Sequence, residues 1–357
     1  MDQEIRFATA TDGVRIAYAV HGSGPPLVRA AHWLTHLEHD WRSPVWRHWL
    51  EALGRSFRVI RYDERGCGLS DRDIHPPGLD DFVGDLEVVV DAVGLETFDL
   101  LGTSQGGAIA VTYAARHPER VRRLVLYGAS ARGRLRRGQT GAAEEADLLH
   151  DLIRHGWGRP NPAFRRVFST LFTPDAGPEH LEALDELMRV SLTGEEALRL
   201  RRAFDAVDVT DLARRVRAPT IVIHPRDDGI VPFDEGRLLA TLIPGARFEP
   251  LDGRNHLMLE TEPAWTRFIE LVRSFLGVAA PSKHPREPVD DRAMDALSDR
   301  EREILALVAA GRSNVEIAEA LVLSPRTVER HLSNVYDKLG ITGKAARAAA
   351  AARHARR

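Results

Sequence analysis

Three residue types that together can activate a hydroxyl group as a nucleophile occur at suggestive places in this chain. Ser104 lies in Gly102-Thr103-Ser104-Gln105-Gly106, between an apolar run and a helix-forming stretch. A serine hydroxyl attacks a carbonyl carbon readily only when a histidine removes its proton and a buried carboxylate orients that histidine. The glycines two residues before and after Ser104 permit the strained strand-to-helix turn that exposes such a serine.

A histidine and a carboxylate that could complete the group each follow a predicted strand. Asp228 comes after the run at residues 220–223, and His256 comes after the run at residues 247–251. We therefore predict Ser104 as the nucleophile, His256 as the base and Asp228 as the orienting carboxylate. The neighbouring Asp227 is the alternative carboxylate, which we interpret as a solvent-exposed loop residue. The backbone N–H of Gln105, at the start of a helix, is predicted to donate to the developing oxyanion.

Apolar, β-branched runs alternate with helical segments along most of the chain. Residues 5–10 and 14–20 flank Thr11-Asp12-Gly13 and predict a β-hairpin. Further strands are predicted at residues 27–28, 57–62, 98–101, 121–127, 220–223 and 247–251. Strands that alternate with helices form a mostly parallel sheet covered on both faces, the α/β class. Residues 132–216 break this alternation with helical segments only, and they predict a helical cap.

Aromatic residues are concentrated shortly before the strand predicted at residues 57–62. Four of the six tryptophans lie there: Trp33, Trp41, Trp46 and Trp49. They predict either core packing or an apolar pocket for a ring-containing ligand beneath the cap. His36 and His39 lie in the same stretch without a third ligand at a suitable spacing, so we predict no metal site. The lone cysteine, Cys67, excludes an internal disulfide.

Residues 297–339 contain three helix starts in close succession. Ser298 and Ser313 are each followed three residues later by glutamate, which forms a capping box, and Ser324-Pro325 combines an N-cap with a first-turn proline. Val328, Leu332, Val335 and Leu339 follow spacings of four, three and four and predict a buried face on the third helix. Only a very short turn separates the second and third helices. This is the layout of a helix-turn-helix, whose second helix enters a DNA major groove.

Charge is distributed unevenly along the chain. The net charge is −3, yet residues 292–357 hold 12 basic against 8 acidic residues, a balance of +4. A basic segment attracts a polyanion, although a solvated surface is the alternative. The first residues lack the basic and apolar regions of a secretory signal, and no apolar run reaches the roughly 18 residues of a membrane span. We expect a cytoplasmic protein that does not enter a membrane.

Residues 5–276 resemble the α/β-hydrolase superfamily through the turn around Ser104, the Asp228 and His256 turns, and the segment from Tyr62 to Asp71. In that family the loop after the third strand reads His-Gly-x and donates a second oxyanion N–H. Here it reads Ala31-His32-Trp33, so the resemblance assigns the second donor to Trp33. It also assigns the ligand pocket to His32, Trp33 and Leu34, gives Asp63 and Arg65 a loop-bracing role, and implies no cofactor.

The C-terminal segment closely resembles a LuxR-type helix-turn-helix. The matching motifs are Leu297-Ser298, Arg300-Glu301, Gly311, Ser313-Asn314, Glu316-Ile317-Ala318, Leu323-Ser324, Arg326-Thr327-Val328, His331 and Lys338-Leu339-Gly340. The resemblance implies binding of double-stranded DNA by Arg326, Thr327, Arg330, His331, Asn334 and Lys338. It also implies a fourth helix, at residues 344–352, which commonly supports a homodimer. A basic protein-binding bundle is the alternative.

The sequence therefore predicts an α/β-hydrolase domain at residues 1–278, a proline-rich linker at 279–291 and a LuxR-type domain at 292–357. We interpret the protein as a DNA-binding transcription regulator. Its hydrolase domain would sense a small apolar ester-, lactone- or ring-containing ligand, with or without slow hydrolysis. A working serine hydrolase, an esterase or lactonase with the DNA-binding domain as a tether, is the alternative.

Overall fold

The computed structural model describes residues 2–278, 297–339 and 350. The chain divides into two compact units, residues 1–281 and 282–357. The predicted linker at 279–291 and most of the predicted fourth helix at 344–352 fall outside the described residues. Among the described residues, no helix combines the length and the apolar character needed to cross a membrane.

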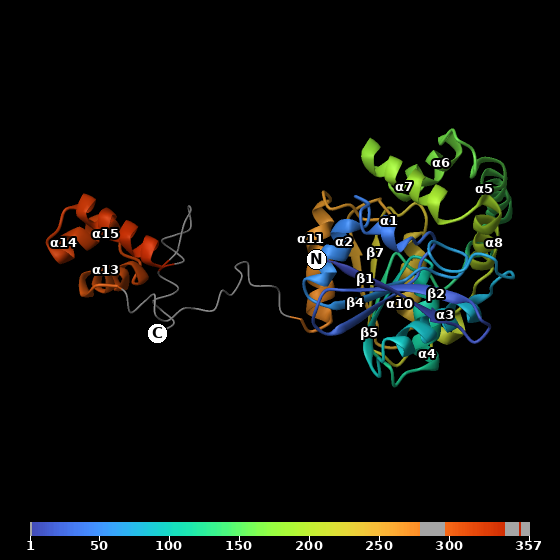
Figure 1. The fold of residues 1–357 in the computed structure, drawn as a ribbon, viewed down its shortest axis with the longest axis horizontal. Coiled ribbons are helices and arrows are strands. Elements are labelled where there is room, and N and C mark those ends of the chain that lie inside the picture. The colour runs from blue at the N-terminus through green and yellow to red at the C-terminus, as the bar shows by residue number, and fades with distance from the viewer. Residues whose placement is uncertain (1, 279–296, 340–349, 351–357) are drawn as a thin grey trace. The chain divides into compact units, whose positions relative to one another are not determined.

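An eight-stranded sheet forms the centre of the first unit (Figure 1). The strands lie in the spatial order β1-β2-β4-β3-β5-β6-β7-β8. The first two pair antiparallel, as the predicted hairpin requires, and from β4 onward all neighbours are parallel. The predicted α/β class is thus confirmed. The strands are β1 (Gln3–Thr9), β2 (Arg15–His21), β3 (Pro26–Ala30), β4 (Arg58–Tyr62), β5 (Phe98–Thr103), β6 (Val121–Tyr127), β7 (Thr220–Pro225) and β8 (Arg247–Leu251).

Helices pack against the sheet in two sets. The first set contains α2 and α11, which meet through Trp49 and Phe268 with ring centroids 4.6 Å apart. The second set contains α3, α4, α9 and α10, and each of these helices contacts the next one in this order. Trp46 and Trp49 are almost fully buried, so these two serve core packing rather than a pocket. The helices are α1 (Leu37–Asp40), α2 (Arg47–Gly54), α3 (Leu79–Ala92), α4 (Gly106–Arg116), α9 (Thr210–Ala213), α10 (Phe233–Leu242) and α11 (Pro263–Phe275).

The predicted helical cap is present, and its helices lie together beside the sheet, coloured green in Figure 1. It comprises the 3-10 helix η1 (Arg134–Arg136), α5 (Ala142–Gly156), α6 (Ala163–Phe172), α7 (Pro178–Ser191) and α8 (Gly194–Asp205). Its two connections to the sheet are joined to each other, because the Gly133 and Val209 amides donate to the carbonyls of Val207 and Ala131, each at 2.8 Å. The end of α7 is attached as well, through the Gly68 amide and the Ser191 carbonyl at 2.9 Å.

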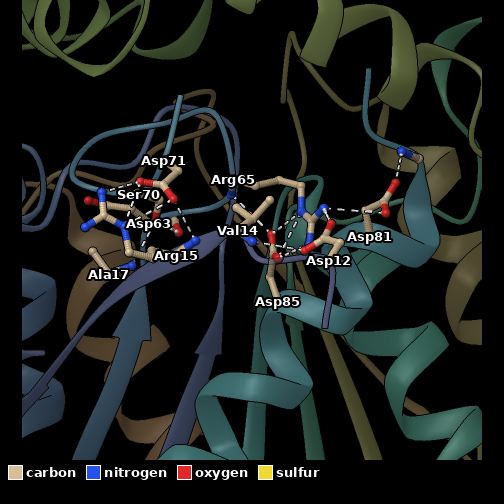
Figure 2. Close-up of polar contacts among 11 residues, drawn as sticks. Asp12, Val14, Arg15, Ala17, Asp63, Arg65, Ser70, Asp71, Asp81 and Asp85 are labelled. Carbon is tan, nitrogen blue, oxygen red and sulfur yellow. Dashed lines mark hydrogen bonds and ion pairs between the residues drawn. The ribbon is translucent and has the colours of Figure 1, made fainter. Parts of the chain in front are cut away.

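A buried arginine braces the loop that follows β4, as Figure 2 shows. Arg65 donates from Nε and Nη2 to the carboxylate of Asp85, which is fully buried, and from Nη1 to Asp12 at 2.6 Å. Asp63 Oδ2 accepts the amides of Leu37 and Leu69 at 3.2 and 2.9 Å. Burial raises the pKa of Asp85 to about 6 although Arg65 opposes the shift. The bracing role expected for Asp63 and Arg65 matches these contacts.

The second unit contains three described helices, α13 (Asp299–Ala309), α14 (Asn314–Leu321) and α15 (Pro325–Lys338). The capping boxes predicted at Ser298 and Ser313 are both confirmed. The predicted face of α15 is buried, since Val328 and Leu332 pack against α13 and α14 and Val335 packs with Leu297. Val322 ends α14 in the left-handed region, with φ of 52° and a 92% exposed side chain, a conformation that is uncommon for a β-branched residue.

The buried Arg65–Asp85 pair yields a stability prediction. Arg65→Ala leaves the Asp85 carboxylate buried without its main partner, and we expect the first unit to lose about 3–5 kcal/mol of its free energy of unfolding. All six tryptophans lie within residues 33–265, so tryptophan fluorescence during urea unfolding reports on the first unit alone. The control is Arg6→Ala, which removes an exposed ion pair with Glu4 and should leave the midpoint unchanged. Equal midpoints for the two variants would contradict this prediction.

Candidate functional site

Ser104 lies on the tight turn between β5 and α4, with φ of 54°. The turn requires glycine on both sides because the backbones meet there. A Cβ atom on Gly102 would lie 2.8 Å from the Cα of Gly107, and one on Gly106 would lie 2.6 Å from the carbonyl oxygen of Ala31. A serine in the left-handed region is strained, and the close packing around it holds the residue in that conformation.

His256 and Asp228 meet at the ends of β8 and β7. The Nδ1 of His256 lies 2.7 Å from Oδ2 of Asp228, and both side chains are buried. The other carboxylate oxygen accepts the amides of Ile230 and Val231 at 2.8 and 3.0 Å. Burial by itself would raise the pKa of Asp228, but the charge and hydrogen bond of His256 outweigh burial and leave that pKa below its ordinary value. The neighbouring Asp227 is exposed.

This arrangement fixes the tautomer of the neutral imidazole. A carboxylate that accepts from Nδ1 requires the proton on that nitrogen, which leaves the lone pair on Nε2. Nε2 of His256 is buried and has no hydrogen-bond partner among the described residues. A neutral histidine in this tautomer can accept a proton from a hydroxyl group.

A cavity opens above Ser104, beneath the cap. Ser104, Gln105 and Trp33 all line it, so the predicted nucleophile and the residues of both predicted oxyanion donors come to one place. Its unfilled space is about 550 Å³, part of it open to solvent. Apolar walls come from Phe172 and Phe204 of the cap. The enclosed part that water can occupy is only about 50 Å³, so side chains that line the cavity must shift before a small molecule with an apolar portion can lie against the serine.

His32 and Leu34, also predicted at the pocket, are not among the residues that line this cavity. His32 is buried beneath the loop, where Nη2 of Arg29 lies 2.6 Å from its Nε2 and its Nδ1 lies 3.0 Å from the Trp33 carbonyl oxygen. Arginine can only donate, so Nδ1 carries the proton and donates to that carbonyl. Burial and the charge of Arg29 lower the pKa of His32 well below its ordinary value. A neutral His32 thus supports the loop that carries Trp33.

Buried charges surround His32 on the same side of the loop. Burial lowers the pKa of Arg29 to about 9 and raises that of Asp40 to about 7. Arg61 lies 3.7 Å from Asp40.

His36 is the N-cap of α1, where its side chain accepts a hydrogen bond from the amide of His39. Among the described residues, no group of three or more His, Cys, Asp or Glu side chains is arranged to hold a metal ion.

Sequence reasoning missed two features of this site. The first is the attachment of the cap to the histidine loop: the His256 amide donates to the Phe172 carbonyl at 2.8 Å, and Asn255 Oδ1 accepts the Asp175 amide at 3.0 Å. Helix α6, which ends at Phe172, was not predicted individually. The second is a group of three cap arginines that line the cavity, Arg134, Arg137 and Arg201. The dense arginines of residues 132–137 were the available signal.

The second candidate site is the outer face of α15. Arg326, Arg330 and Asn334 are exposed, whereas Thr327 and His331 are half-buried. Thr327 also takes part in the helix start, since its amide donates to Ser324 Oγ at 3.1 Å and its hydroxyl lies 2.7 Å from the same atom. Arg326, Arg330 and Asn334 each present hydrogen-bond donors, which suit phosphate and base edges.

Lys338, at the end of α15, is tied to its own unit. Its Nζ lies 2.7 Å from Oε2 of Glu301 on α13. Burial would raise the pKa of Glu301, but the hydrogen bonds from Lys338 and Ser298 outweigh burial, and the pKa is lowered. A contact of Lys338 with a DNA phosphate would compete with this ion pair.

Comparison with known families matches both units. The family model of the alpha/beta hydrolase fold matches residues 39–263, and that of the LuxR family of bacterial regulatory proteins matches residues 295–351. The second match places a regulatory DNA-binding module over α13, α14 and α15. The first covers the strands from β4 to β8, the Ser104 turn and the cap.

Several relatives are similar to about three quarters of this chain. The pyrrolizixenacetamide deacetylase of Xenorhabdus hominickii is 29% identical over 73% of this chain and 94% of its own length. The 2-hydroxy-6-oxo-2,4-heptadienoate hydrolase of Pseudomonas putida is 30% identical over 72% and 87%. The crystal structure of the enol-lactonase from Burkholderia xenovorans has a TM-score of 0.63 at 26% identity and covers 76% of this chain and all of that one.

The geometry around Ser104 yields a labelling prediction. We expect a serine-directed fluorophosphonate to label Ser104, and we expect His256→Ala to reduce the labelling rate by about 100-fold or more, because the proton acceptor is lost. Mass spectrometry of the labelled peptide identifies the site. Ser104→Ala is the negative control, because it lacks the hydroxyl group that would be labelled.

The adjacent carboxylates supply a matched control. Asp228→Asn removes the acceptor that holds the His256 tautomer, so labelling should fall strongly, whereas the exposed Asp227→Asn should label at the wild-type rate. Equal labelling of wild type and His256→Ala, or equal loss in the two asparagine variants, would refute the assignment of these roles.

Proposed function

This chain belongs to the α/β-hydrolase family and carries a LuxR-family regulatory domain, and on that premise we propose that it is a transcription regulator controlled by a small molecule. In this proposal the hydrolase unit binds an ester, a lactone or a related acyl compound, with or without slow hydrolysis, and the second unit binds double-stranded DNA. The observation that carries the proposal is the presence in one chain of a cavity over Ser104 and an exposed face on α15 that carries Arg326, Arg330 and Asn334. We further propose that the protein acts as a homodimer in the cytoplasm.

The chemistry proposed for the first unit is acyl transfer. Ser104 attacks the carbonyl carbon while His256 Nε2 accepts its proton, and Asp228 stabilises the resulting imidazolium. The backbone N–H groups of Gln105 and Trp33 donate to the oxyanion. His256 then passes the proton to the leaving group, and water releases the acyl group by the same steps in reverse. The names of the relatives, a deacetylase, a dienoate hydrolase and an enol-lactonase, fit hydrolysis of an acyl compound.

A second candidate function is a working hydrolase for which the DNA-binding unit is only a tether. One observation favours it: a receptor that merely binds its ligand has no need of the buried His256–Asp228 pair, whose desolvation costs free energy. Dependence of DNA affinity on ligand separates the two functions.

The exposed face of α15 yields a DNA-binding prediction for the full chain. Arg330→Ala should cost roughly 1–3 kcal/mol at particular base pairs if Arg330 reads a base edge, and Lys338→Ala should reduce the salt slope by about one if Lys338 binds a phosphate. Fluorescence anisotropy with a selected operator at several salt concentrations measures both. Arg302→Ala, on α13, removes the same charge elsewhere in the unit and should change neither quantity. Unchanged affinity in all three variants would contradict DNA binding by α15.

Regulation by a ligand yields a reciprocity prediction. If a cavity ligand changes operator affinity by 5- to 150-fold, equivalent to roughly 1–3 kcal/mol, the operator must change ligand affinity by the same factor. Calorimetric titration of Ser104→Ala protein, which prevents turnover, measures ligand affinity with and without operator DNA. Identical ligand affinities in the two titrations would reject the regulator and favour the tethered enzyme.

A further inference from the structure

The cavity above Ser104 has a cationic wall. Arg134, Arg137 and Arg201 line it on the cap side, and Asp205 is the single acidic lining residue. The other lining residues are neutral, and several are apolar. Because a cavity wall of low polarity strengthens electrostatic interactions, the charge balance of these four residues determines which ligands can enter favourably.

Asp205 is already engaged by two other side chains. Arg201 donates to both of its oxygens, with Nη2 at 2.8 Å and Nε at 3.2 Å. Nε2 of His150 lies 3.0 Å from Oδ2 of the same carboxylate. The Arg201 guanidinium also lies 5.7 Å from the ring of Trp33, the predicted oxyanion residue. The Asp205 carboxylate is therefore the partner of Arg201 and is not available to the other two cavity arginines.

Arg134 and Arg137 differ in their partners. The buried Arg134 pairs at 2.6 Å with Glu145, which is 58% exposed, so Arg134 already has a carboxylate partner. Arg137 donates to the backbone carbonyls of Arg132 and Ile230 at 3.2 and 3.5 Å. Within the described part of the chain, no carboxylate lies within ion-pair distance of Arg137. Burial lowers the pKa of Arg137 to about 10, so the group remains charged at neutral pH.

Glu235 and Asp205 lie near enough to favour the charge of Arg137 but do not outweigh its burial. A partly buried guanidinium without a direct ion-pair partner is costly, and a bound anion offsets that cost. The guanidinium group presents paired donors that match a carboxylate. Phe172, Phe204 and Val207 line the same cavity as Ser104 and Arg137, so an apolar chain can lie against this wall and connect the two ends of a ligand.

We propose that Arg137 is a specificity-determining residue that binds a ligand carboxylate, so the natural ligand is an ester or lactone that carries a carboxylate separated from the reacting carbonyl by an apolar segment. This inference rests on the proposed function of the Ser104 site and narrows it. The tryptophan-rich loop alone indicated an apolar ligand. The proposal makes the ligand amphipathic instead.

The test uses pairs of compounds that differ only in one charge: monomethyl and dimethyl esters of the linear dicarboxylic acids from succinate to suberate. Calorimetry with the Ser104→Ala protein measures binding without turnover. We expect at least one monoester to bind about 10- to 100-fold more tightly than its diester, the range for a hydrogen-bonded charge pair. We expect Arg137→Gln to abolish that preference while leaving the diester affinity unchanged.

Arg136→Gln is the matched control, because Arg136 is the adjacent exposed arginine and does not line the cavity. It should retain the full preference for the monoester. Equal affinities of every monoester and its diester for the parent protein would overturn the proposal, as would an Arg137→Gln variant that retains the preference. Loss of monoester and diester binding alike in Arg137→Gln would assign Arg137 a structural role and overturn it too.

The proposed function fails in a different way. If Ser104 does not react with the fluorophosphonate but the monoester still binds in an Arg137-dependent manner, the carboxylate site stands and hydrolysis at Ser104 is rejected. If labelling occurs and no monoester is preferred, the serine chemistry stands and the carboxylate site is rejected.

Discussion

Parallel pairing of β7 with β8 is the constraint on which the rest of the site depends. The ladder pairs Pro225 with Leu251 and continues past the strands, where the Arg226 amide donates to the Leu251 carbonyl and the Asp227 amide donates to the Gly253 carbonyl. These bonds hold two short loops side by side at one edge of the sheet. Asp228 and His256 lie on those loops, so their 2.7 Å contact follows from strand register. A shift of β8 by one residue would separate them.

The loop after β3 is held between two arginines. Below it, Arg29 donates to His32, whose other nitrogen supports the Trp33 carbonyl; above it, Arg201 lies over the Trp33 ring. Each arginine is partly neutralised by a nearby aspartate, Asp40 or Asp205. Burial of so much charge costs free energy. We infer that it is retained because it fixes a loop that, in this chain, has histidine where glycine usually gives the backbone its freedom.

Local signals in the sequence were sufficient for much of this structure. The capping boxes at Ser298 and Ser313 and the apolar spacing of α15 depend on residues within a few positions, and the structure contains each of them. The Ser104 turn was recognisable because its glycines are needed for close packing. The remaining features depend on residues distant in sequence. Asp227 and Asp228 differ only in which of them faces β8. The three arginines of the cavity come together only when the cap folds. His32 is directed away from the pocket because Arg29 lies beneath it.

The attachments of the cap determine how a ligand can reach the serine. The cap is attached where its two connections meet near Gly133 and Val209, at Ser191, and at Phe172, whose carbonyl accepts the His256 amide. Lifting it as a rigid lid would break the backbone hydrogen bonds at Ser191 and Phe172 and would pull on the loop that holds His256. We therefore expect ligands to pass between side chains at the mouth, by rotamer changes on the picosecond to nanosecond timescale, instead of waiting for the slower opening of a whole subdomain. A receptor with such an entrance equilibrates quickly, so its occupancy would follow the momentary concentration of the ligand and keep little memory of earlier exposure.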